Sequence, residues 1–105
     1  MNFQRRIAFG RIAAAALGRS DTIARRWLPD GRREGAEWSS RNPLRDDRKR
    51  GSFKINLDTG KWSDFATGDC GADLISLGAY LHRLSQSQAA LKIAHMLGVN
   101  AYDQT

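Results

Sequence analysis

The stretch FKINLDTGKWSDF, residues 53–65, decides the fold class. Apolar and polar side chains alternate from Phe53 to Leu57, which is the period of a strand with one buried face. Asp58-Thr59-Gly60 fits a three-residue hairpin loop with Gly60 in the left-handed conformation, and residues 61–65 form the return strand. The stretch therefore predicts a β-hairpin. Its buried side is expected to comprise Phe53, Ile55, Leu57 and Phe65.

Upstream of the hairpin, residues 37–41 predict a third strand, which completes a three-stranded antiparallel sheet. Residues 1–30 predict two helices. The first is expected over residues 4–17, because apolar side chains recur at a helical period and four consecutive alanines favour a helix. The second is short, with Ser20 or Asp21 as its N-cap.

Downstream of the hairpin, two helices close the chain. Asp73 is the expected N-cap of the first, after a glycine-rich turn. Ser85 and Gln88 have the S-x-x-Q spacing of a capping box for the second helix, and Gly98 ends it. Residues 99–105 are expected to be a frayed tail.

These elements predict a single α+β domain over residues 1–105. Its small three-stranded antiparallel sheet is flanked by N-terminal helices and a C-terminal helical hairpin. The expected parts are the N-terminal helices in 1–30, the sheet with a basic loop in 32–66, the two helices in 73–98 and the tail in 99–105.

The charge of the chain is uneven, although its net value is only +6. Residues 1–50 hold 13 Lys and Arg against 6 Asp and Glu, whereas residues 51–105 hold 4 against 5. This imbalance favours a polyanionic partner, and a solvated basic face is the alternative. A single cysteine, Cys70, excludes an intrachain disulfide and favours a reducing, cytoplasmic setting. No apolar run is long enough for a membrane span, so no membrane partner is expected.

Cationic and aromatic side chains alternate through the sheet region, a combination typical of single-stranded nucleic-acid binding, in which cations hold phosphates and aromatics stack on bases. For each tryptophan taken alone, a place in the core is the competing interpretation. The predicted nucleic-acid-binding residues are Arg32, Arg33, Trp38, Arg41, Arg45, Arg48, Lys49, Arg50, Lys54, Lys61 and Trp62.

The order of motifs from Arg41 to Leu97 resembles the N-terminal zinc-ribbon domain of bacterial, phage and plasmid DNA primases. The matching motifs are Asn42-Pro43-Leu44-Arg45 at the first knuckle, DDRKRGSF over 46–53, the hairpin FKINLDTGKW, Asp64 to Gly68 at the second knuckle, Gly71-Ala72-Asp73, and the closing helices DLISLGAYL and SQSQAALKIAHML. The resemblance implies a zinc-ribbon-like hairpin core and a non-catalytic module that binds template DNA for a primase or primase-helicase of a mobile element.

The resemblance does not extend to the metal. The four ligand positions are occupied by Asn42, Arg45, Asp64 and Thr67, and His82 and His95 lie far away in the helical region. A structural zinc normally needs four Cys or His ligands, so no metal or other cofactor is expected. We hypothesise that hydrogen bonds among the four substituting residues replace the metal cross-link.

Two other functions are compatible with the sequence. The chain is alternatively a protein-interaction adaptor that docks through its N-terminal helices onto a replication or nucleic-acid-processing complex. A metal-dependent nuclease using Asp46, Asp47, Asp64 and Asp69 is disfavoured, because nothing in their spacing makes these carboxylates converge. An anion site at the start of the helix after Asp73 is also disfavoured, since Asp69 and Asp73 repel phosphate.

Overall fold

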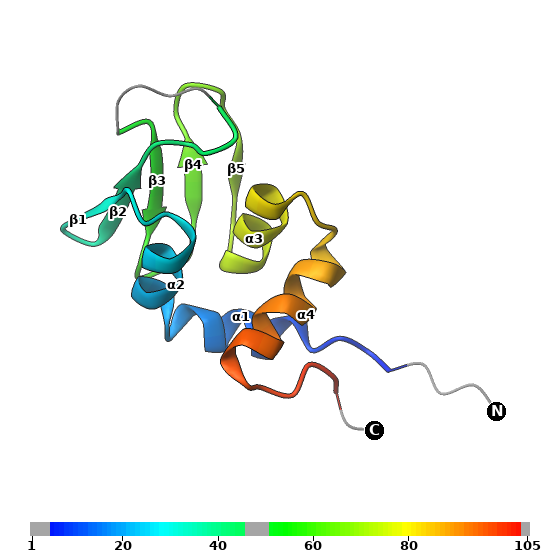
Figure 1. The fold of residues 1–105 in the computed structure, drawn as a ribbon. Helices are drawn as coiled ribbons and strands as arrows, with labels where there is room; N and C mark the ends of the chain where they lie inside the picture. Colours follow the sequence, from blue (N-terminus) through cyan, green and yellow to red (C-terminus); the bar gives the residue numbers. More distant parts are fainter. Residues whose placement is uncertain (1–4, 46–50, 104–105) are drawn as a thin grey trace.

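The computed structural model describes residues 5–45 and 51–103, and it has an α+β fold (Figure 1). The α+β class predicted from the sequence is therefore confirmed. The helices of the described residues are α1 (Phe9–Leu17), α2 (Ser20–Trp27), α3 (Leu74–His82) and α4 (Gln86–Leu97). The strands are β1 (Arg32–Glu34), β2 (Glu37–Ser40), β3 (Phe53–Asn56), β4 (Trp62–Asp64) and β5 (Cys70–Gly71).

The sheet has five antiparallel strands in the order β1-β2-β3-β4-β5, so the prediction of three strands is wrong. The predicted β3–β4 hairpin is present, and Gly60 has a φ of +81° at its turn. The two additional strands lie at the edges. All three residues of β1 are exposed, so β1 lacks the alternating pattern of a half-buried strand. The two residues of β5 lie in a glycine-rich segment that was interpreted as a turn.

One face of the sheet forms the core together with the helices. Phe53, Ile55 and Trp62 point to this face and are buried, and they join Leu77 and Ile93 of the helices in one cluster. In Figure 1 the sheet occupies one end of the molecule, and α1 and α4 lie toward the other. The hydrophobic core is therefore shared by all of the helices and the inner strands.

Phe65 does not belong to this core, contrary to the prediction. Its side chain is 70% exposed. Trp62 and Asp64 of β4 face inward, and side chains alternate along a strand. A residue one position beyond Asp64 must therefore point to the opposite face of the sheet. The backbone N–H of Phe65 donates to the carbonyl of Ser52 at 2.8 Å, which continues the β3–β4 pairing past the end of β4.

Local capping signals account for both C-terminal helices. The Asp73 side chain accepts the backbone N–H of Ser76 at 2.8 Å and begins α3. The predicted capping box of α4, formed by Ser85 and Gln88, is present, and Gly98 ends α4 with a φ of +69°. The expected cap of α2 is wrong, since that helix has no side-chain cap. The hydroxyl of Ser20 instead donates to the carbonyl of Leu57 at 2.6 Å and ties α2 to the sheet.

The two ends of the chain pair with each other, which the sequence did not predict. Residues 5–8 are not helical, and Ile7 forms a β-bridge with Tyr102. The guanidinium of Arg11 donates to the carbonyls of Asn100 and Tyr102, both at 3.1 Å. The segment expected to fray is thus held against α1 as far as Asp103. Residue 4, where the first helix was expected to begin, lies outside the described residues.

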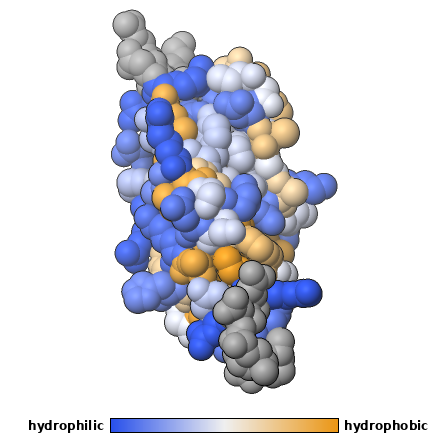
Figure 2. Space-filling model, turned by 90° about the vertical axis from the view of Figure 1, so that its right-hand side faces the viewer, coloured by the Kyte–Doolittle hydropathy of each residue, from blue (hydrophilic) through white to orange (hydrophobic). Residues whose placement is uncertain are grey.

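The surface of the described residues is mainly polar on the side that Figure 2 shows. Hydrophobic residues gather there in small groups among hydrophilic ones. Among residues 5–45 and 51–103, no helix combines the length and the apolar character that crossing a bilayer requires.

Candidate nucleic-acid interface

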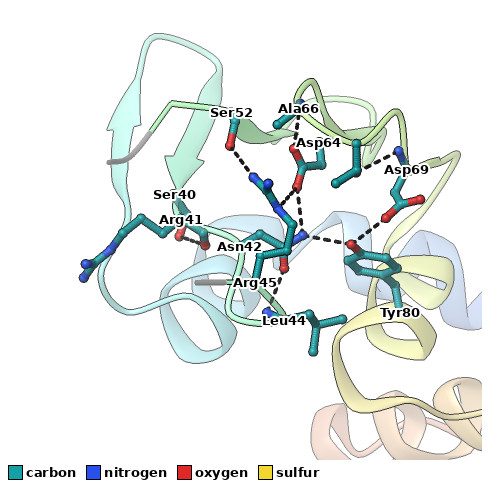
Figure 3. Close-up of polar contacts among 11 residues, drawn as sticks. Ser40, Arg41, Asn42, Leu44, Arg45, Ser52, Asp64, Ala66, Asp69 and Tyr80 are labelled. Atoms are coloured by element: carbon teal, nitrogen blue, oxygen red, sulfur yellow. Dashed lines mark hydrogen bonds and ion pairs between the residues drawn. The ribbon is translucent and has the colours of Figure 1, made fainter. Parts of the chain in front are cut away.

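The loops that follow β2 and β4 meet at a buried carboxylate. Asp64 and Asn42 are both fully buried. The side-chain amide of Asn42 donates to Oδ2 of Asp64 at 2.9 Å, and Nε of Arg45 donates to the same oxygen at 3.1 Å (Figure 3). A second guanidinium nitrogen of Arg45 donates to the hydroxyl of Ser52 at 3.3 Å. We call Asn42, Arg45 and Asp64 the polar clasp.

Both loops fold in the same way around the clasp. Oδ1 of Asn42 accepts the backbone N–H of Leu44 at 2.9 Å, and Oδ1 of Asp64 accepts that of Ala66 at 2.8 Å. In each case a side-chain oxygen bonds a backbone amide two residues later, which is an Asx-turn. Asn42 and Asp64 therefore each shape the turn that follows them, and their side chains also contact each other.

Helix α3 is attached to the clasp through Tyr80. The side-chain amide of Asn42 donates to the Tyr80 hydroxyl at 2.8 Å, and that hydroxyl donates to Asp69 at 2.8 Å. The ring of Tyr80 lies 4.7 Å from that of Trp62 and 6.1 Å from that of Phe53, measured between centroids. Burial and the nearby carboxylates of Asp69 and Asp64 raise the pKa of Tyr80, against the hydrogen bond from Asn42.

The charge of Asp64 is stabilised by its donors. Burial alone raises the pKa of this carboxyl, because it disfavours the ionised form. Hydrogen bonds from Asn42 and from the backbone of Ala66 and Thr67, together with the charge of Arg45, outweigh burial, and the pKa of Asp64 lies below its ordinary value. The clasp is therefore an ion pair in which hydrogen-bond donors satisfy the carboxylate oxygens of Asp64.

The four residues that the resemblance to a zinc ribbon assigns to ligand positions do not suit a metal ion. Asn42, Arg45 and Asp64 are in mutual contact, and the Thr67 hydroxyl accepts the backbone N–H of Asp69 at 3.2 Å. The guanidinium of Arg45 supplies a positive charge against Asp64, so a cation there would be repelled. Within the described residues, no three His, Cys, Asp or Glu side chains gather as a metal site. The hypothesised hydrogen-bonded link between the loops is present for Asn42, Arg45 and Asp64.

The face of the sheet that points away from the core carries a cross-strand row of polar side chains. Strand pairing places Arg32, Ser39, Lys54, Ser63 and Cys70 side by side, one from each strand. Ser39 is fully buried, and among the described residues its hydroxyl has no hydrogen-bond partner. The accessible atoms of the row therefore belong mainly to its other members. We call this surface the open sheet face.

Three of the predicted binding residues share the open sheet face. Arg32 and Lys54 belong to the cross-strand row, and Lys61 lies two residues before Ser63 on the return strand. Arg41 lies beyond the end of β2 and lines a pocket with Trp27 and Leu28 at the end of α2. All of them are exposed except Lys54, which is half-buried. The open sheet face thus brings together bases that are up to 29 positions apart in the numbering, from Arg32 to Lys61.

Carboxylates accompany Arg41 and two of the three bases on the open sheet face. Arg41 lies 3.3 Å from Asp30, Arg32 lies 3.9 Å from Glu34, and Lys54 lies 4.0 Å from Glu37. Exposed pairs of this kind contribute little, about 0–1 kcal/mol each, so a phosphate can compete with the carboxylates. Within the part of the chain that the structure describes, Lys61 has no acidic partner.

The other predicted basic residues lie elsewhere. Arg33 pairs with Trp38 across β1 and β2, which assigns it to the helix-covered side of the edge strand, and its side chain donates to the carbonyl of Gly35. Arg45 belongs to the polar clasp and is only 32% exposed. Arg48, Lys49 and Arg50, together with Asp46 and Asp47 of the nuclease alternative, lie outside the described residues.

Both predicted tryptophans are core residues. Trp38 and Trp62 are 3% and 5% exposed. The indole N–H of Trp38 donates to the carbonyl of Leu28 at 3.0 Å, and that of Trp62 donates to the hydroxyl of Ser76 at 2.9 Å. The core interpretation is confirmed for each, and neither ring is accessible to a base. The exposed aromatic ring of the open sheet face is Phe65, which strand alternation from Trp62 could have identified.

Comparisons of the chain with protein-family models, with curated proteins and with solved structures return no match.

Replacing Asp64 by Asn tests the polar clasp. We expect Asp64→Asn to lower the free energy of unfolding by about 2–4 kcal/mol near neutral pH, because it leaves Arg45 without its counter-charge. The pKa of Asp64 is lowered in the folded state, so its stabilisation is present above the unfolded pKa of about 3.9 and is lost as the pH falls through the folded pKa.

Urea denaturation of the parent and of Asp64→Asn at pH 7 and pH 3 measures this effect. The stability difference between the two proteins is expected to narrow at pH 3. Asp58→Asn, a matched change in the exposed hairpin turn, is the control and should be nearly neutral at pH 7. Equal effects of the two substitutions at pH 7 would contradict the clasp.

Proposed function

We propose that this chain is a non-catalytic module that binds single-stranded DNA on the open sheet face. The observation that carries the proposal is the convergence of Arg32, Lys54 and Lys61 on the one face of the sheet that the core does not use. Flexible strands are held in this way by cations that follow the phosphate backbone.

Phe65 supports the same proposal. Its side chain is 70% exposed, so the ring is accessible to a base. It follows Lys61 and Ser63 on the same face of the return strand. Cations and an exposed ring on one strand provide both parts of a single-strand binding surface, namely phosphate contacts and a platform for one base.

The proposed biological setting is template binding for a primase or primase-helicase of a mobile element. It rests on the resemblance of the motifs over residues 41–97 to the primase zinc ribbon. The polar clasp supports this kinship, because Asn42, Arg45 and Asp64 lie in contact at positions where the ribbon has metal ligands. In this proposal an ion pair with hydrogen bonds takes over the cross-linking role of the metal.

Substituting Phe65 tests base stacking with a matched control in the same chain. We expect Phe65→Ala to weaken binding of oligo-dT by about 5- to 100-fold, as stacking contributes about 1–3 kcal/mol per base. Phe9, which is 42% exposed on α1, is the other exposed phenylalanine of the described residues, and Phe9→Ala should leave affinity unchanged. Fluorescence anisotropy with a labelled oligonucleotide measures both, and equal affinities for Phe65→Ala and the parent would reject Phe65 as the platform.

Removing two cations tests the electrostatic part. The double variant Lys54→Gln/Lys61→Gln should lower affinity for single-stranded DNA about tenfold at low salt and reduce the salt slope by about 1.4, the value expected for two lost phosphate contacts. Arg19→Gln/Arg83→Gln removes the same charge from exposed helix ends and serves as control. Equal losses in the two variants would indicate only a net-charge effect. Salt-insensitive binding to a protein partner, with no DNA binding, would favour the adaptor alternative.

Restoring ligands tests the kinship with the zinc ribbon. In a Cys70→Ser background, cysteines at positions 42, 45, 64 and 67 should bind one Co²⁺ with the absorption of a tetrahedral thiolate site, because the two loops already face each other across the clasp. Cysteines at 42 and 45 alone are the control and should bind more weakly. A folded quadruple variant without stoichiometric Co²⁺ binding would contradict the proposed geometry.

A further inference from the structure

A second basic site lies among the helices, away from the open sheet face. A cleft of about 590 Å³ opens between the end of α2, the end of α3 and the outer side of α4. Its lining comprises Arg26, Trp27, His82, Lys92, His95 and Met96. These three helices contribute buried residues to the same hydrophobic core as the inner strands. No residue of this cleft belongs to the surface proposed for single-stranded DNA.

The cleft has a concentration of cationic groups without carboxylates. Arg26 and Lys92 bring fixed positive charges from two helices, and the imidazoles of His82 and His95 add nitrogen donors. No Asp or Glu lines the cleft, and among the described residues neither Arg26 nor Lys92 forms an ion pair. Like charges held this close repel one another, so an anionic ligand would relieve that repulsion as well as bind.

The other walls of the cleft are apolar. The indole of Trp27 packs against Gly78, where a Cβ would approach its ring to 3.0 Å, and it lies edge-on to His82 with ring centroids 5.1 Å apart. These contacts fix the indole in the wall, where it remains half-buried. Nδ1 of His82 lies 3.1 Å from the carbonyl oxygen of Gly78, which leaves Nε2 as the ring nitrogen open to a ligand. Nε2 is an acceptor in the neutral ring, and it donates to a phosphate as the imidazolium. Met96 completes an apolar surface beside the cations.

We propose that this cleft binds a nucleoside phosphate, with its phosphates on Arg26, Lys92 and the imidazoles and its base against Trp27 and Met96. The volume lies in the range of small-molecule sites, about 300–1,000 Å³. Guanidinium and ammonium groups recognise phosphate, and an indole edge or face beside them accommodates a planar base. The ligand is either a free nucleotide or the phosphorylated end of a nucleic-acid strand, and the two share the same chemistry.

Titration of the full chain with dTTP, with thymidine and with oligo-dT carrying or lacking a 5′-phosphate distinguishes these sources. Calorimetry measures affinity, and the change in tryptophan fluorescence on binding reports the site, since Trp27 lines the cleft whereas Trp38 and Trp62 are buried in the core. We expect dTTP or the 5′-phosphorylated strand to bind at least tenfold more tightly than its phosphate-free counterpart. Preference for dTTP identifies a free nucleotide, and preference for the phosphorylated strand identifies a strand end. Absence of a phosphate effect in both pairs would overturn the proposal.

Reciprocal variants separate this site from the open sheet face. Arg26→Gln/Lys92→Gln should weaken phosphate-dependent binding at least tenfold, whereas Lys54→Gln/Lys61→Gln should leave it unchanged. The two positions of the first pair are exposed, so the fold is expected to persist, and circular dichroism verifies this. Unaltered dTTP and strand-end binding in Arg26→Gln/Lys92→Gln, or tight binding of a phosphate-free Asp/Glu peptide in place of nucleotides, would reject the site without bearing on the open sheet face.

Discussion

The organisation of the sheet end of the molecule depends on one buried carboxylate. Asp64 is fully buried, and an isolated ionised carboxylate in such a position costs several kcal/mol. The cost is offset only because Asn42, Arg45 and two backbone N–H groups converge on it. The side-chain donors come from the segment after β2, and the backbone donors, Ala66 and Thr67, come from the segment after β4. The ionised state of Asp64 therefore fixes the path of the chain after β2 and after β4 at the same time.

The clasp also fixes what the sheet can offer to a ligand. Because Asp64 faces inward, strand alternation turns Trp62 inward and Phe65 outward. The indoles of Trp38 and Trp62 are then buried in the core, where each N–H has a hydrogen-bond acceptor. An aromatic side chain is available for recognition only at a position that strand alternation turns away from the core, as it does at Phe65. The same constraint that builds the core thus determines which ring is available on the open sheet face.

The sequence predicted the features that depend on local chemistry. The hairpin at Gly60, the caps at Asp73 and Ser85 and the helix end at Gly98 follow from short-range rules and are present. Features that depend on partners distant in sequence escaped prediction. The tail pairs with Ile7, β5 has only two residues, and the Ser20 hydroxyl bonds Leu57 instead of capping α2.

The predictions for the candidate site show the same division between features set by local sequence and features set by distant partners. Residue type alone indicated a basic and aromatic region, but the face on which each side chain lies follows from register. Register separates Arg32 from its neighbour Arg33 and places Arg45 in the polar clasp. The error at Phe65 came from grouping it with Phe53, Ile55 and Leu57 in the core while Trp62 was assigned to the binding surface, so the faces of the return strand were exchanged. The cross-strand register, which pairs Ile55 with Trp62, decides the faces, and alternation along the chain alone does not.

The charge balance of the open sheet face bears on how such a module would work. Three bases, two of them beside carboxylates, make few phosphate contacts. Non-specific binding of this electrostatic kind has dissociation constants of about 10⁻⁴–10⁻⁶ M at physiological salt. A contact this weak holds a strand only briefly, which suits a template that must move past the module. Appreciable occupancy of the module by DNA then requires a second binding site for the same strand, because linking two weak sites raises the effective concentration of each. A primase or helicase domain is the partner that the proposed function assigns to this task.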